Sequence, residues 1–217
     1  MLPDSPVISP VADEPRSPAR MGLVRFGDDP GIAFLLEDFE AAFTAYAHIS
    51  GSGCPEFSSF SVDGDEVDGT FDSIVLGMKA SDLAQGRLMR LATLAQTGGR
   101  LYAIIDTDGL DSAEGRPTAM ELKAFAQEHG LLWGGAAVLA TGGASSRFRP
   151  SPRMGLLRRP FSETMDKLVG AARMSCSVAC AQELGGADVD TLDRESIICA
   201  KPALPGSLWQ LIMRQQH

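Results

Sequence analysis

Short apolar runs recur along this chain, each followed by a polar loop and then by a helical pattern. The clearest runs are Ser73–Gly77 (SIVLG), Leu101–Ile105 (LYAII) and Gly135–Thr141 (GAAVLAT). Continuous runs of this length are typical of β-strands that are buried on both faces. Because parallel strands need long crossovers, strands that alternate with helices predict a parallel sheet with helices on both of its faces.

Weaker patterns complete this series. Two further strands are expected at Met21–Phe26 and at Phe57–Val62, where polar residues alternate with apolar ones as on an exposed edge. Helices are expected at about Ile32–Ala47, Asp82–Gln96, Pro117–His129 and Pro160–Leu184. The predicted fold class is therefore α/β, a doubly wound five-stranded parallel sheet with helices on both faces.

The N-terminal segment differs in composition from the rest of the chain. Residues 1–20 hold five prolines among Asp, Glu and Ser, which predicts a disordered tail because such a segment buries too little apolar surface. Residues 21–217 are expected to form one domain, with a C-terminal extension from about residue 185. No charged and then apolar leader precedes this domain, which predicts a cytoplasmic protein.

Charge is unevenly distributed along the chain. The net charge is -9, so neither nucleic acid nor an anionic membrane is an expected partner, and no apolar run is long enough to span a bilayer. Between Arg25 and Lys79 the only residue of basic type is His48. The acidic residues there are Asp28, Asp29, Glu37, Asp38, Glu40, Glu56, Asp63, Asp65, Glu66, Asp68 and Asp72.

Arginines gather later in the chain, at Arg147, Arg149, Arg153, Arg158 and Arg159. Three interpretations are open: a solvated loop with no role, a surface that complements the acidic segment of a partner subunit, or a site for the phosphates of NADPH.

Cysteine and histidine spacing does not indicate a metal site. Cys54, Cys176, Cys180 and Cys199 form no CxxC pair and no zinc-ligand spacing with the histidines. Cys176 and Cys180 are four apart on an expected helix, which favours two adjacent buried thiols over a redox pair.

Three segments carry a resemblance to a known family. They are FAQEHGLLWGGAAVLATGGA (Phe125–Ala144), MGLLRRPFSETMDKLVGAA (Met154–Ala172) and KPALPGSLWQLIMRQQH (Lys201–His217). Together they resemble the flavodoxin-like NAD(P)H-dependent FMN reductases. The resemblance implies FMN, reduced by NADPH or NADH, a small-molecule electron acceptor and a homodimer. Since the flavin carries the electron chemistry, no catalytic residue is nominated.

Ligands of a doubly wound sheet bind beyond the carboxyl ends of its strands, so the candidate cofactor-binding residues are those in four loops. They are Gly27 and Gly31 after the first strand, Met78, Lys79, Ala80 and Ser81 after the third, Thr107, Asp108 and Gly109 after the fourth, and Gly142 and Gly143 after the fifth.

Two of these loops depart from what FMN needs. The turn GDDPG has no hydroxyl group, and its Asp28 and Asp29 would repel a phosphate unless they cap the next helix and face away. The loop from Met78 to Asp82 has no aromatic residue to stack on the flavin ring, although Lys79 could stabilise a reduced anionic flavin.

Two functional hypotheses follow. The first is an FMN-binding NAD(P)H-dependent oxidoreductase. The alternative is a flavodoxin-fold protein with a degenerate flavin site that acts as a structural or interaction module. A Rossmann-type enzyme is less favoured, since no GxGxxG follows a predicted strand.

Overall fold

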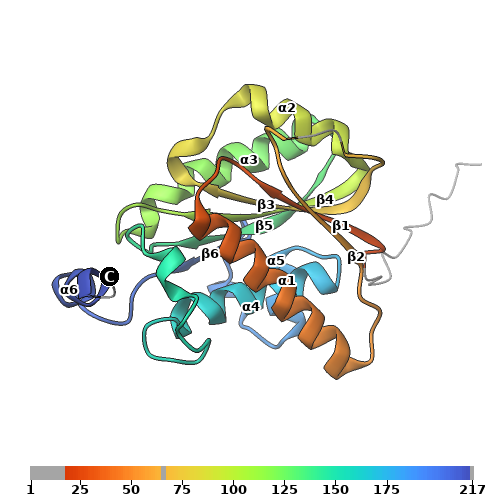
Figure 1. Ribbon diagram of the computed structural model, residues 1–217. Coiled ribbons are helices and arrows are strands. Elements are labelled where there is room, and N and C mark those ends of the chain that lie inside the picture. Colours follow the sequence, from red (N-terminus) through yellow and green to blue (C-terminus); the bar gives the residue numbers. More distant parts are fainter. Residues whose placement is uncertain (1–17, 65–66, 216–217) are drawn as a thin grey trace, which may run out of the picture.

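The computed structural model describes residues 18–64 and 67–215, and the expected tail from residue 1 to residue 17 lies outside them. Within this part of the chain, six parallel strands form one sheet in the order β2-β1-β3-β4-β5-β6 (Figure 1). They are β1 (Arg20–Arg25), β2 (Glu56–Ser61), β3 (Phe71–Lys79), β4 (Ala95–Asp106), β5 (Leu132–Leu139) and β6 (Ile197–Ala200). The order of the first five is that of flavodoxin-like folds, so the predicted fold class is confirmed.

Helices cover both faces of the sheet. One face packs against α1 (Pro30–Ser50), α4 (Arg159–Arg173) and α5 (Val178–Leu184), and the other against α2 (Gln85–Leu94) and α3 (Arg116–Glu128). A last helix, α6 (Gly206–Gln215), lies off the end of the sheet in Figure 1. Short 3-10 turns are η1 (Ala80–Asp82), η2 (Ser112–Gly115), η3 (Ser145–Phe148) and η4 (Val189–Thr191). None of the described helices has the length and apolar composition that a membrane span requires.

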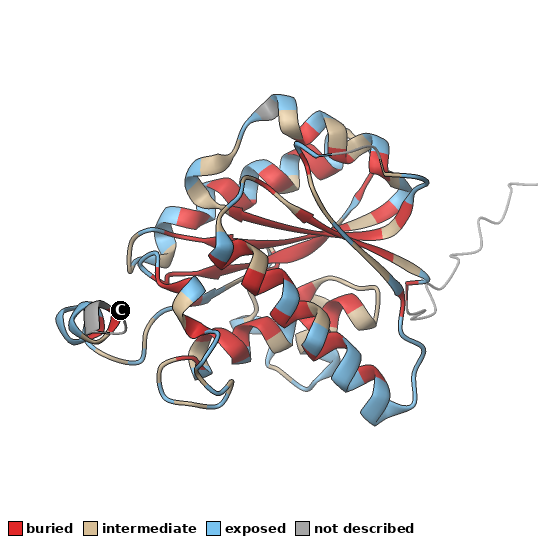
Figure 2. Cartoon of the chain, viewed as in Figure 1, coloured by how far each residue is buried: buried red, intermediate tan, exposed pale blue. Residues whose placement is uncertain are grey.

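The apolar face of α1 fixes how closely this helix approaches the sheet. Phe39 and Phe43 are fully buried, and the sheet side of α1 is coloured as buried in Figure 2. A Cβ atom on Gly77 of β3 would lie 2.9 Å from side-chain carbons of Ile32 and Leu36. Only a glycine at this position lets α1 pack so near the middle of the sheet, since real Cβ contacts are longer.

The prediction of a single helix at Pro160–Leu184 is wrong. The chain breaks between α4 and α5, where Ser175 has φ +46°. Tyr102 of β4 holds this break, because its hydroxyl is shared between the carbonyl oxygens of Ala171 and Cys176, at 3.1 and 2.9 Å. Backbone oxygens that a continuous helix would have used are thereby satisfied from the sheet.

Three further boundaries differ from those expected. The sheet has a sixth strand, β6, rather than ending at five. The helix expected at Asp82–Gln96 is only Gln85–Leu94, because β4 already begins at Ala95. Arg20, placed in the tail, belongs to β1, and the amides of Ala19 and Arg20 donate to the carboxylate of Asp72 at 2.7 and 2.9 Å.

Candidate functional site

The candidate residues gather at the carboxyl edge of the sheet, where parallel strands place their loops together. Lys79 ends β3 and Asp106 ends β4, while η1 carries Ala80 and Ser81. Gly27, Gly142 and Gly143 all have positive φ, so the backbone turns sharply after β1 and after β5.

Some candidates are already used in packing. Met78 lies inside β3 rather than in the loop, and its fully buried side chain belongs to the core under α2 and α3. Thr107 is buried and donates to the carbonyl oxygen of Gly109 at 2.9 Å, and that same oxygen accepts from the amide of Gly142 at 3.1 Å. The loops after β4 and β5 are therefore bonded directly to each other.

Asp29 caps the N-terminus of α1. One oxygen of its carboxylate accepts from the amides of Gly31 and Ile32, at 2.7 and 3.2 Å. Partial burial raises the pKa of Asp29, but the bonds from Lys79 and from the two amides outweigh it, so this pKa lies below its ordinary value. A protein carboxylate thus occupies the helix amides that bind phosphate in many folds.

Ser145 closes the same helix end from another direction. A Cβ atom on Gly31 would lie 2.0 Å from the Ser145 hydroxyl oxygen, so η3 rests directly on the first turn of α1. Gly31 therefore provides close contact between two parts of the protein, and not the open space that a ligand would need.

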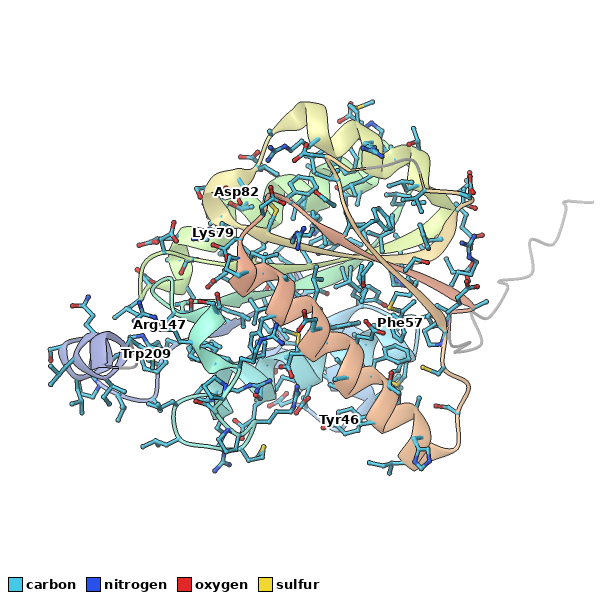
Figure 3. All side chains as sticks on the ribbon, viewed as in Figure 1. Tyr46, Phe57, Lys79, Asp82, Arg147 and Trp209 are labelled. Atoms are coloured by element: carbon cyan, nitrogen blue, oxygen red, sulfur yellow. The ribbon has the colours of Figure 1, made fainter. Side chains whose placement is uncertain are left out.

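Lys79 bridges two carboxylates. Its Nζ lies 3.1 Å from Asp29 and 2.9 Å from Asp108, and Figure 3 shows Lys79 at this edge of the sheet. The hydrogen bond to Asp108 is the main cause that raises the pKa of Lys79, partial burial opposes it, and the bond to Asp29 adds to it. Lys79, the candidate cation for the flavin ring, instead neutralises the carboxylates of Asp29 and Asp108.

Asp106 lies beneath this bridge and is almost fully buried. Its two oxygens accept from the hydroxyls of Thr141 and Ser145, at 2.6 and 2.7 Å. Burial raises the pKa of Asp106 to about 6, although the two hydroxyl groups and the charge of Lys79 lower it. Asp106 thus holds the loop after β5, and through Ser145 it holds η3 on α1.

The C-terminal helix covers the strand ends on the β5 side. Trp209 of α6 is buried, and its ring N–H donates to the carbonyl oxygen of Thr141 at 3.0 Å (Figure 3). Its ring packs against Phe148 and Phe161, with centroids 5.8 Å away in both cases. Arg147 donates to the carbonyl oxygen of Met213, which fixes the far end of α6.

Three arginines of the cluster pair with acidic residues of α1, a contact that none of the three interpretations named. Arg149 reaches Glu37 at 2.7 Å and Arg158 reaches Asp38 at 2.5 Å, while Arg153 also bonds to Asp38. Arg158 and Asp38 are both buried. These pairs fasten the segment after η3 along α1.

FMN does not fit the residues at this edge. Its phosphate would meet the Asp29 carboxylate at the helix amides, and Ser145 fills the space beside Gly31. The loops from Lys79 to Ala84 and from Asp106 to Asp111 contain no aromatic residue for the ring. The aromatic residue that α6 brings near, Trp209, is enclosed by its own neighbours.

Sequence reasoning named the loops but missed the residues that close them. Asp106, Ser145 and Trp209 were not candidates, although Asp106 directly follows the apolar run LYAII at the place where a strand-end carboxylate is expected to lie. Of the two aspartates expected to cap the next helix and face away, Asp29 is the cap, with its carboxylate on the helix amides, and Asp28 pairs with Arg25 instead.

Comparison with known proteins adds little to this description. No protein-family model matches the chain, and no curated protein matches it. A solved flavodoxin from Streptococcus pneumonia TIGR4 aligns with 71% of this chain and 97% of its own length, at 7% identity and a TM-score of 0.48. The strand order and the helices on both faces make the fold of this chain flavodoxin-like.

Proposed function

We propose that this chain is a flavodoxin-fold protein with a degenerate flavin site, which acts as a structural or interaction module. The observation that carries this proposal is the Asp29 carboxylate on the amides of Gly31 and Ile32. These amides are the donors that a bound phosphate would require.

The electrostatics support the same reading. A phosphate dianion about 5 Å from the Asp29 carboxylate would be repelled by several kcal/mol at an effective dielectric constant of about 20. Lys79 does not offset this repulsion, since Asp29 and Asp108 already share its charge. Displacing Asp29 would also remove the cap of α1, which costs about 1 kcal/mol.

The rival function is the NAD(P)H-dependent FMN oxidoreductase, which passes electrons to a small acceptor. What favours it is the fold, with four loops converging at the carboxyl edge, and the left-handed backbone at Gly142 and Gly143. It requires the Asp29 and Ser145 contacts to open when FMN arrives.

A titration separates the two functions. The purified protein should lack flavin absorbance and should not quench FMN fluorescence at high micromolar concentration. Asp29→Ser retains a helix cap and supplies a hydroxyl without the charge, so it should bind FMN more tightly than the wild type. Asp28→Ser is the matched control, because Asp28 is 95% exposed and pairs with Arg25 rather than with the helix amides.

The proposal fails if the wild-type protein binds FMN at micromolar concentration and NADPH or NADH reduces the bound flavin. Equal FMN affinity of Asp29→Ser and the wild type would show that Asp29 is not what excludes the phosphate.

A further inference from the structure

A second concave site lies away from the strand-end loops, between the first half of α1 and the edge of the sheet. It is an open hollow with a volume of about 170 Å³. Leu23 of β1 and Leu36 of α1 form apolar walls, and Ser59 and Ser61 of β2 line the outer side. The volume is below that of sites for drug-sized ligands, which begin at about 300 Å³, so only a small molecule would fit.

The pocket exists because the side chains on one face of β2 become smaller toward the end of the strand. Phe57 fills this face further back, where its ring meets Phe43 edge-on with centroids 5.4 Å apart (Figure 3). Two and four residues later the same face carries Ser59 and Ser61, which are too small to reach α1. The space under the start of α1 is left open as a result.

Two opposite charges line this pocket. Arg25 ends β1, and its Nε is buried with no hydrogen-bond partner. Arg25 pairs through Nη2 with Asp28 at 3.4 Å, but the Asp28 carboxylate is 95% exposed, and such a pair contributes little. Guanidinium groups bind carboxylates best through two parallel hydrogen bonds. Arg25 therefore has donors left to bind a further carboxylate.

Glu37 of α1 supplies the negative charge. It pairs with Arg149 at 2.7 Å, but both side chains are more than half exposed, so this pair exchanges readily with another cation. A carboxylate on one wall would repel a simple anion and attract an ammonium group. The lining therefore favours a ligand that carries both charges and a short apolar body.

We propose that this pocket binds a small α-amino acid with an aliphatic side chain. The ligand carboxylate binds Arg25, its ammonium group binds Glu37, and its side chain packs against Leu23 and Leu36. Ser59 and Ser61 line the same pocket. The site does not involve Asp29 or Lys79, so it goes beyond the proposed function and stands whether or not FMN binds.

Amide NMR of the full chain with L-leucine tests the site. Millimolar leucine should shift the amides around Leu23, Ala33 and Ser59 and leave those around Lys79 unchanged. Two analogues separate the charges: isocaproate lacks the ammonium group and isoamylamine lacks the carboxylate. Each should bind at least several-fold more weakly than leucine.

Variants test the Arg25 wall and the open space of the pocket. Arg25→Gln removes a charge-assisted bond and should weaken leucine binding at least tenfold, and Ser59→Phe should abolish binding by filling the pocket. Arg87→Gln is the matched control: Arg87 is also a partly exposed arginine paired with an aspartate, Asp63, but it lies on α2 and does not line the pocket.

Three results would overturn the proposal. One is no amide shift at tens of millimolar leucine, and another is unchanged binding to Arg25→Gln. The third is isocaproate or isoamylamine binding as tightly as leucine, since the pocket would then not select a zwitterion. Should Ser59→Phe fail to fold, Arg25→Gln and the two analogues still decide the question.

Discussion

Asp106 is a buried acid whose protonation affects the stability of this fold. Its pKa is raised to about 6, against about 3.8 in an unfolded chain, because burial penalises its charged form. Between these two values the folded state binds more protons than the unfolded state, so this group makes the protein less stable as the pH rises. A difference of about two units corresponds to about 3 kcal/mol.

Asp106→Asn should remove this dependence, because the amide keeps a hydrogen-bond acceptor for Thr141 and has no charge. The difference in unfolding free energy, variant minus wild type, should increase by about 3 kcal/mol between about pH 4 and pH 7. Urea unfolding at several pH values measures it. Parallel curves for the two proteins would mean that Asp106 is not perturbed by its burial.

Two neighbouring acidic residues of α1 should differ sharply in their contribution to stability. Asp38→Ala leaves the buried guanidinium of Arg158 without its carboxylate, and breaking a buried pair in this way costs about 3 kcal/mol or more. Glu37→Ala breaks only an exposed pair and should cost less than about 1 kcal/mol. Denaturant midpoints of the two variants give the comparison, and equal losses would contradict it.

At the scale of elements, the strands buried on both faces were the most predictable. SIVLG and LYAII lie in β3 and β4, and the first five residues of GAAVLAT lie in β5, because continuous apolar runs are typical of strands buried on both faces. The break in the helix after Pro160 was not predictable, because it depends on the hydroxyl of Tyr102, about seventy residues away in the chain.

The loops of the candidate site could be located from the sequence, but the way they close could not. When a polar loop follows a buried strand, the loop is expected at the carboxyl edge of the sheet. The sequence GDDPG likewise indicates a helix cap. The contact of Ser145 with Gly31 and that of Trp209 with Thr141 join segments far apart in sequence. No local pattern carries such pairings.

Helix α6 is expected to dock mainly through Trp209. Trp209→Ala removes a large buried side chain and should release α6, so that its amides exchange hydrogen much faster while those of β3 keep their protection. Trp209→Phe keeps one aromatic ring but loses the bond to Thr141, worth about 1 kcal/mol, and part of the buried indole, so it should have a smaller effect than Trp209→Ala.

Leu211→Ala is the control on the same helix. Leu211 is 54% exposed, so its loss should change the exchange of α6 amides little. Rapid exchange of α6 in the wild-type protein would contradict the stable docking that its buried residues indicate.

Across the whole molecule, the charge segregation of the sequence largely disappears. The acidic segment pairs with bases from elsewhere: Glu56 with Arg20, Asp63 with Arg87, and Asp38 with Arg153 and Arg158. Arginines of the cluster therefore form ion pairs with residues of the acidic segment in the same chain.

The strand order predicts where a second copy would bind if the expected homodimer forms by pairing of edge strands. Central strands β1, β3, β4 and β5 have a neighbour on each side, whereas β2 and β6 have one each.

Outward amides of β2 should therefore exchange hydrogen much faster than amides of β3 in dilute protein. Mass spectrometry of exchanged fragments, at two protein concentrations, measures this. Slow exchange at β2 in dilute protein would contradict the prediction, and protection of β2 that rises with concentration would place the second copy on that edge, beside the pocket of Arg25.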